Sequence, residues 1–486
     1  MKLSRYFSKK SISTIQSESQ GKDLSRSLDA WNLISLGIGC IIGAGIFVMT
    51  GKAAADHAGP AIMLSFVFSG FACVLAALCY AELASVLPVS GSAYTYTYAT
   101  LGEVLAWVMG WLLVLEYGLA ASTVAVGWSG YVVSFMKDFG IVIPHSLSSS
   151  YFEVDTTGQL VASGNFNLIA FVGVMVITML LVIGVKESAR VNNVIVAIKL
   201  SVVVGFIVVG AFYVHPENWH PFIPEYIPPT VPGGEGKYGF DGVLRAASII
   251  FFAYIGFEAV STAAQEAKNP QRDIPIGVLG SLFVCTALYI LVCAVLTGIV
   301  SYTELSVPDP MAVAVDKIGL GWFAFLIKIG AITGLTSVML VLLYGQTRIF
   351  YVMSHDGLIP SIFSRIHQKF HTPHINTVIV GSIVAVASAL TPIQVLGDMV
   401  SLGTLTAFVV VCFSVMYMRR KHPDLHRPFR CPGMPWIPLA GIALCLYLIS
   451  GMPMETFHRM KWWFVLGAAI YLGYGQFKSK LNKARA

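Results

Sequence analysis

Glycines punctuate an apolar stretch near the start of the chain, GIGCIIGAGIF, which runs from Gly37 to Phe47. Each glycine weakens a helix by roughly 1 kcal/mol relative to alanine. The stretch lies within an apolar run at about 31–55, which is long enough to span a bilayer. Unwound backbone is tolerated at membrane depth only where it is buried in protein or lines a cavity. We therefore expect a broken helix whose free N–H and C=O groups face a small solute, as in secondary transporters.

Three ionisable residues lie inside other apolar runs, where they could carry protons. Lys199 falls about nine residues into NNVIVAIKLSVVVGFIVV, too deep for its ammonium to reach water easily. Glu116 lies in LLVLEYGLAAS, and Glu258 follows Gly256 in FFAYIGFEAVS. Intramembrane charges cost a few kcal/mol and mark functional sites by default, and burial favours their uncharged forms. A permanently paired structural role remains the alternative for Lys199 and for both carboxylates.

The composition predicts the elements that must position these residues. The chain is 56% hydrophobic and 12% charged, with a mean hydropathy of +0.74, which indicates a polytopic membrane protein and not a globular enzyme. Apolar runs of spanning length predict about twelve helices. Their approximate cores are 31–55, 61–87, 98–135, 166–184, 191–214, 242–265, 275–300, 322–354, 375–391, 395–418, 435–452 and 461–477.

The net charge of +6 bears on orientation and not on nucleic acid. Most lysines and arginines fall in the two tails and in alternate loops, and the positive-inside rule then places both termini in the cytoplasm. The predicted outer loops keep only Lys137, Lys237, Lys317, Arg459 and Lys461. Residues 1–28 lack an apolar core and are interpreted as a cytoplasmic tail and not as a signal peptide.

A second interruption at Gly256, in the sixth segment, indicates an internal repeat. Broken first and sixth helices predict a five-plus-five inverted arrangement, with two further helices outside it. The transport core would then cover 29–418, the last two helices 419–478 and a short cytoplasmic tail 479–486. Close helix packing is the alternative explanation for a lone glycine.

Four motifs together carry a family resemblance. They are GIGCIIGAGIF, FFAYIGFEAVSTAAQEAKNPQRDIP, AELASVLPVSGSAYTYTYATLGE and YGQTRIFYVMSHDGLIP. The chain resembles the amino acid–polyamine–organocation superfamily, and within it bacterial relatives of the cationic amino acid transporters. The resemblance implies an all-α, LeuT-like fold and amino-acid transport coupled to protons or to exchange.

A free amino acid is a zwitterion, so its site needs donors for a carboxylate and acceptors for an ammonium. A half-helix beginning at Ala44, Gly45 and Ile46 would offer N–H groups and a positive dipole end to the carboxylate. The resemblance implies that carbonyls of both broken helices accept from the ammonium. The expected substrate-binding residues are Ile41, Ile42, Gly43, Ala44, Gly45, Ile46, Phe252, Ala253, Tyr254 and Ile255.

The resemblance also suggests roles for three single residues, Phe252, Lys199 and Glu258. Phe252 matches the position of an aromatic gate above the substrate. Lys199 matches a lysine whose charge replaces the sodium ion of related transporters, so that loss of its proton would mimic ion release. Glu258 matches an acidic residue beside the gate and is expected to join the two half-helices as a structural or pH-responsive hydrogen-bonding group. Glu116 matches no general family position and is a proton site, a substrate-tuning group or a structurally paired carboxylate. Glu82 is expected to anchor a loop or close an inner gate.

The apolar stretch SVMLVLLYG of the eighth helix favours a small neutral amino acid such as alanine, because a buried cationic side chain needs a partner. Cationic amino acids remain an alternative substrate class if the carboxylate of Glu116 or Glu258 reaches the substrate site. The expected partners are the L-amino acid, protons and the lipid bilayer of the cell membrane, with no nucleic acid and no cofactor. A small single-span membrane subunit is left open. An amino-acid/amine antiporter and a transport-dead amino-acid sensor are the alternative functions. The sequence contains neither a P-loop nor a metal-ligand spacing, so no motif in it indicates an enzyme.

Overall fold

The computed structural model describes residues 9–10, 28–87, 92–155, 159–184, 189–229, 236–263, 266–370 and 372–483. The first half of the chain forms mostly long helices, with a two-stranded antiparallel hairpin in one loop. Its elements are α2 (Ala30–Ile41), α3 (Thr50–Ala53), α4 (Ile62–Val86), α5 (Ser92–Thr100), α6 (Glu103–Asp138), α7 (His145–Ser148), β1 (Phe152–Val154), β2 (Leu160–Ala162), α8 (Leu168–Ile183) and α9 (Ala189–Gly210).

The second half repeats this pattern without strands in the described residues. Its helices are α10 (Gly239–Ile250), α11 (Ala259–Thr262), α12 (Pro270–Ile299), α13 (Pro310–Ile318), α14 (Gly321–His355), α15 (His374–Leu390), α16 (Ile393–Lys421), α17 (Trp436–Ser450), α18 (Met454–Ile470), α19 (Gln476–Lys478) and α20 (Lys480–Lys483). Short π and 3-10 turns extend or interrupt several of them, and two are important below: the π turn Gly45–Met49 and the 3-10 turn Phe251–Tyr254.

The two halves correspond helix by helix, which confirms the expected repeat. Each half opens with a broken helix, and each has its longest helix in third place, α6 with 36 residues and α14 with 35. The fourth helix is short in both halves, at 16 residues in α8 and 17 in α15. The fold is therefore all-α and LeuT-like, with α17 and α18 following the repeat.

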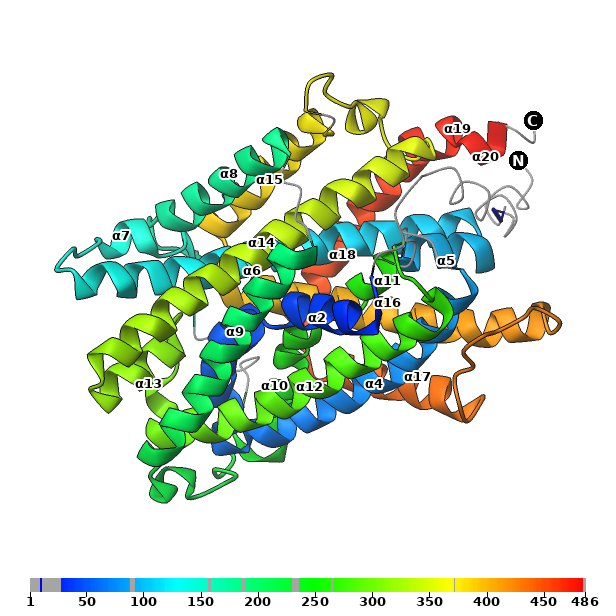
Figure 1. Cartoon of the computed structure of the whole chain (residues 1–486). Coiled ribbons are helices and arrows are strands. Elements are labelled where there is room, and N and C mark those ends of the chain that lie inside the picture. The colour runs from blue at the N-terminus through cyan, green and yellow to red at the C-terminus, as the bar shows by residue number, and fades with distance from the viewer. Residues whose placement is uncertain are drawn as a thin grey trace.

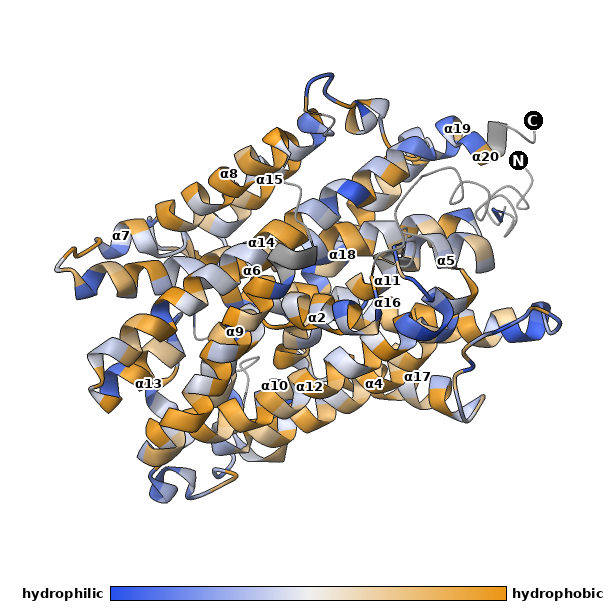
Figure 2. Cartoon of the chain, in the orientation of Figure 1, coloured by the Kyte–Doolittle hydropathy of each residue, from blue (hydrophilic) through white to orange (hydrophobic). Residues whose placement is uncertain are grey.

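Apolar residues cover the long helices, whereas polar residues gather at their ends and in the loops (Figure 2). Among the described residues, seven helices are long and apolar enough to cross a membrane, or eight if the bent pair Trp436–Ser450 and Met454–Lys478 counts as one span. The stretch Ala30–Val86 counts once although it contains both α2 and α4, and two shorter apolar helices are α8 and α15. Helices occupy each of the predicted ranges, while twelve crossings stay a prediction.

The third predicted helix, 98–135, was wrong in its start. The structure has a separate helix α5 that ends at Thr100, and α6 begins at Glu103. Gly102 between them has φ 100, a left-handed conformation that glycine adopts without a steric penalty. The seventh helix also begins earlier than predicted, at Pro270, because proline is well tolerated in the first turn of a helix.

Helices of the repeat pack in two groups. Helix α12 lies against both α2 and α4, and α10 also packs on α4. In the second group α6 packs along α14, and α8 packs on α15 (Figure 1). Both described termini lie at one end of the molecule: the Lys10 ammonium is 3.3 Å from the Asp356 carboxylate, and Lys480 N donates to the Asp356 carbonyl. Predicted tail residues 1–8, 11–27 and 484–486 lie outside the described residues.

Candidate substrate site between two broken helices

The first helix is interrupted where the glycines predicted. Helix α2 ends at Ile41, and Ile42 is extended, with φ −72 and ψ 98. The chain turns helical again at Ala44 and continues through the π turn Gly45–Met49. The first four N–H groups of a helical segment have no partner within it. The N–H groups of Ala44, Gly45 and Ile46 therefore form a donor end at the break.

The second interruption lies in the sixth segment of the repeat. Helix α10 tightens into the 3-10 turn Phe251–Tyr254, Ile255 is extended, and Gly256 has φ 119. The Glu258 carboxylate accepts from Gly256 N, with oxygen–nitrogen distances of 3.0 and 3.2 Å. Glu258 thus satisfies a backbone donor that the break would otherwise leave unpaired in the protein interior.

The two breaks lie directly against each other. A Cβ atom on Gly45 would collide with Ala253 Cα, and a Cβ on Gly256 would approach Cys40 Cβ at 2.8 Å and Cys40 O at 3.0 Å. Both glycines therefore allow the half-helices to approach closely. Gly45 and Gly256 therefore lie at interrupted helices and also permit close packing between them. Both explanations given for these glycines in the sequence analysis apply.

A residue that the sequence did not single out joins the breaks. The Tyr289 hydroxyl of α12 lies 2.7 Å from the Ile41 carbonyl and 3.0 Å from the Ala253 carbonyl, one from each broken helix. A carbonyl oxygen has two lone pairs, so each can accept a further hydrogen bond. The only signal in the sequence was a tyrosine within the apolar run of the seventh helix.

All ten expected substrate-binding residues are buried at the breaks. Val338 of α14 lies over the first break, because a Cβ on Gly43 would meet its two methyl carbons at 3.2 Å. Phe252 is 5% exposed beside the second break. The Tyr254 side chain turns toward α4, where its hydroxyl donates to the Phe66 carbonyl at 2.8 Å. Tyr254 can therefore reach the site through its backbone only.

Lys199 reaches from α9 to the first broken helix. Its ammonium donates to the Gly39 carbonyl at 2.7 Å, and the side chain is 1% exposed. Gly334 of α14 borders the lysine stem, since a Cβ there would lie 3.3 Å from Lys199 Cγ. The lysine thus sits where α2, α9 and α14 meet, two residues along α2 from the Ile41 carbonyl.

Glu116 of α6 and Glu258 of the second break are both buried carboxyl groups, each 1% exposed. Glu116 Oε1 and the hydroxyl of Thr404 are neighbours, and neither makes a hydrogen bond of ordinary geometry within the described residues. A buried carboxyl oxygen needs a donor, which Thr404, a bound proton or a cationic group of a ligand would supply.

Lys328 of α14 is a buried lysine whose ammonium reaches two partly exposed carboxylates. The side chain is 1% exposed and lies 2.9 Å from both Asp138 oxygens and 3.0 Å from Asp316. These aspartates come from the end of α6 and from α13, and they neutralise the buried charge. Pairing, and not exposure, makes Lys328 tolerable.

Glu82 anchors a loop, which is the first of the two roles expected for it from the sequence. Its carboxylate accepts from Arg419 Nε at 2.9 Å and from Cys431 N at 2.8 Å, and it is 2% exposed. Arg427 Nε lies 3.3 Å from the same group. The end of α4 is therefore tied to the end of α16 and to the following loop.

Comparison with known proteins agrees with this geometry. The amino acid permease family profile matches residues 28–473. The chain is 48% identical to the branched-chain amino acid permease BcaP of Bacillus subtilis over 98% of its length and 99% of the relative's. It is 44% identical to the methylthioribose transporter of the same organism, over 99% and 100%. It is also 40% identical to the chloroplastic cationic amino acid transporter 9 of Arabidopsis thaliana, over 84% of this chain and 69% of the plant protein. These relatives are named as permeases and transporters and not as enzymes. The chain, a membrane protein with several apolar spans, belongs to the amino acid permease family of the amino acid–polyamine–organocation superfamily.

Proposed function

We propose that this permease imports neutral aliphatic L-amino acids together with protons, by alternating access. The observation that supports this proposal most directly is the junction of the two breaks with Lys199. One buried ammonium donates to a carbonyl of the same half-helix whose end borders the substrate site. Proton binding and substrate binding would then act on one element.

The substrate backbone would be held by the protein backbone. The N–H groups of Ala44, Gly45 and Ile46 would donate to the carboxylate, at the positive end of the second half-helix. The ammonium would donate to the carbonyls of Ile41 and Ala253, which the Tyr289 hydroxyl already brings together. Carbonyls of Ile42, Phe252 and Ile255 lie at the same breaks and would complete the acceptor set.

Apolar side chains favour a neutral aliphatic substrate. Val338 lies over the unwound Gly43, and Phe252 lies at the other break as the proposed gate. An aliphatic side chain against these groups gains about 0.8 kcal/mol for each buried methylene. The relative named a branched-chain amino acid permease is consistent with this class, from alanine up to leucine.

Lys199 would couple the proton to the movement of α2. A charged donor makes a hydrogen bond roughly twice as strong as a neutral one. Loss of the Lys199 proton therefore weakens its bond to the Gly39 carbonyl and loosens α2 from α9. Release of the proton on the inside would then accompany opening of the site toward the inside.

A second candidate substrate class is the cationic amino acids. The buried Glu116 oxygen, which needs a donor, is the observation that favours it, together with the plant relatives named for cationic amino acids. A lysine or arginine side chain that reached Glu116 would supply that donor. Glu116→Gln would then remove arginine uptake and leave leucine uptake in place.

Competition for leucine uptake into proteoliposomes tests the substrate class. We expect unlabelled leucine, valine and alanine to compete strongly and arginine weakly, with uptake stimulated by an inward proton gradient. Equal competition by arginine would move the assignment to the cationic class. Uptake that appears only in vesicles preloaded with amino acid would instead show an antiporter, and binding without flux would show a sensor.

We also propose the orientation and the boundaries that the sequence predicts. Both termini would face the cytoplasm, with the transport core at 29–418 and the last two helices at 419–478. Cysteine accessibility tests this orientation: a new thiol at exposed Lys317 should react with an impermeant reagent in whole cells, and one at Lys421 should not. The reverse labelling pattern would show that the termini lie outside the cell, opposite to the proposed orientation.

A further inference from the structure

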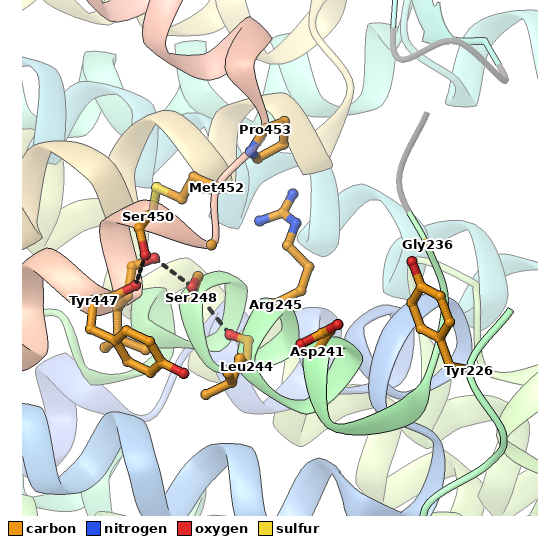
Figure 3. Close-up of a pocket in the computed structure, with 12 residues that line it drawn as sticks. Tyr226, Gly236, Asp241, Leu244, Arg245, Ser248, Tyr447, Ser450, Met452 and Pro453 are labelled. Atoms are coloured by element: carbon orange, nitrogen blue, oxygen red, sulfur yellow. Dashed lines mark hydrogen bonds between the residues drawn. The ribbon is translucent and has the colours of Figure 1, made fainter. Parts of the chain in front are cut away.

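The second broken helix has different surroundings at its two ends. At the proposed outer end, a cavity of about 380 Å³ borders α10, the turn between α17 and α18 and the loop at Tyr226 (Figure 3). Arg245 on its wall pairs with Asp398 of α16 at 2.9 Å. At the proposed cytoplasmic end, where the termini lie, the short helix α5 packs beside α11 (Figure 1). Helix α5 therefore lies where a barrier between the second break and the cytoplasm is needed.

Two tyrosines attach α5 firmly to the helix group formed by α6 and α14. The Tyr94 hydroxyl donates to the carboxylate of Asp356, at the end of α14, at 2.7 Å. The Tyr98 hydroxyl donates to the carboxylate of Glu103, the first residue of α6, at 3.0 Å. A hydrogen bond to a charged acceptor is roughly twice as strong as one between neutral groups. Both bonds therefore hold α5 to the same side of the transporter.

Tyr96, between them in sequence, contacts the other helix group. Its hydroxyl lies beside the Ser261 hydroxyl of α11, and both side chains are fully buried. Ser261 Oγ donates to the Glu258 carbonyl at 2.6 Å and keeps lone pairs that can accept from Tyr96. The Tyr96 oxygen makes no hydrogen bond of ordinary geometry within the described residues. This neutral contact is therefore weaker than the two carboxylate bonds of α5.

We propose that Tyr96 is a positioning residue that latches α11, the inner half of the second broken helix, in its closed position. The proposal rests on alternating access, which is part of the proposed function. When the site opens to the cytoplasm, α11 has to move away from α6 and α14. Helix α5 then stays with its two carboxylate partners, and the Tyr96–Ser261 contact separates. Tyr96 thus sets how readily the inner side opens, although its side chain does not touch the substrate.

Leucine transport measured from each side of the membrane tests the latch. Tyr96→Phe removes the hydroxyl and keeps the buried ring. Loss of one neutral hydrogen bond should raise the population of the inward-open form about threefold. The apparent affinity for a ligand follows the population of the form that binds it. We therefore expect the KM for leucine to fall about threefold in inside-out vesicles and not to fall in right-side-out vesicles.

Tyr98→Phe is the matched control, because it makes the same chemical change on the same helix. Glu103 keeps the hydroxyl of Tyr471 as a donor at 3.0 Å, and α5 and α6 lie on one side of the transporter. Both KM values should therefore stay at their wild-type values. Ser261→Ala removes the other partner of the latch and should act like Tyr96→Phe. The double variant should have no larger effect than either single one, because both changes break one contact.

The outcomes separate the latch from the proposed function. A wild-type KM for leucine in inside-out vesicles of Tyr96→Phe would overturn the latch and leave the transport proposal in place. An equal shift in Tyr98→Phe, or additive shifts from Tyr96→Phe and Ser261→Ala, would overturn it as well. Ser261→Ala carries the test on its own if Tyr96→Phe does not reach the membrane. A wild type that transports leucine in neither direction would overturn both proposals.

Discussion

Tyr289 supplies a single hydroxyl that both broken helices share. Tyr289→Phe removes this donor and leaves the Ile41 and Ala253 carbonyls without it. An unsatisfied buried polar group costs about 1–3 kcal/mol, so we expect a lower melting temperature and weaker leucine binding.

Tyr131→Phe is the matched control for that prediction. The Tyr131 hydroxyl is equally buried and donates to one carbonyl only, that of Phe47, at 2.7 Å. It should lower the melting temperature to a similar extent and change leucine affinity less. Equal losses of affinity in the two variants would show that Tyr289 has no special place at the site.

Single residues were also the hardest features to place from the sequence. Lys199 and Glu258 could be predicted as functional candidates, because an ionisable residue within an apolar segment seldom has only a structural role. The pairing of Arg245 with Asp398 could not be predicted, since the partners lie 153 positions apart along the chain. The ion pairs of Lys328 with Asp138 and Asp316 could not be predicted for the same reason. A single sequence does not show which distant residues are in contact.

At the scale of elements, the glycine at the second break combines two constraints. Gly256 has φ 119, and a Cβ there would press on the Cys40 backbone. Gly256→Ala should therefore abolish leucine binding while the protein still reaches the membrane, since the rigid α2 backbone has no room to yield.

Gly140→Ala provides the comparison for backbone strain alone. Gly140 has φ 75, but no atom lies within 4 Å of the added Cβ. That variant should lose about 1–2 kcal/mol of stability from the left-handed conformation and keep leucine binding. If Gly256→Ala also retains binding, the close contact of the two breaks is not required.

Helix breaks were predictable and helix ends were less so. Glycine clusters and hydropathy indicated both interruptions and every apolar segment, because these are properties of local sequence. The separate helix α5 was missed, since the apolar run continues past Thr100 and only the left-handed Gly102 divides it. The close fit of Gly45 against Ala253 depends on tertiary packing, which the sequence does not display.

At the scale of the whole molecule, Glu82 connects the two halves of the transporter. It joins α4 of the first repeat to α16 and to the loop that leads to α17. Glu82→Gln leaves Arg419 and Arg427 without their shared carboxylate, and breaking a buried pair on one side costs about 3–5 kcal/mol. We expect a clearly lower melting temperature in detergent.

Glu304→Gln serves as the exposed counterpart of that variant. Glu304 and Lys317 form an ion pair at 3.1 Å, and both side chains are about half exposed. Surface pairs contribute about 0–1 kcal/mol, so the melting temperature should hardly change. Equal shifts for the two variants would contradict the role of Glu82 as a connection between the repeats.

If Lys199 couples protons to amino-acid movement, replacing it should uncouple leucine uptake from the proton gradient. Leucine uptake into proteoliposomes is recorded with and without an inward proton gradient, for the wild type and for Lys199→Met, with leucine–leucine exchange as the control for folding. We expect the gradient to stimulate the wild type only, while the variant keeps exchange. Equal stimulation of Lys199→Met by the gradient would show that Lys199 does not couple protons to transport.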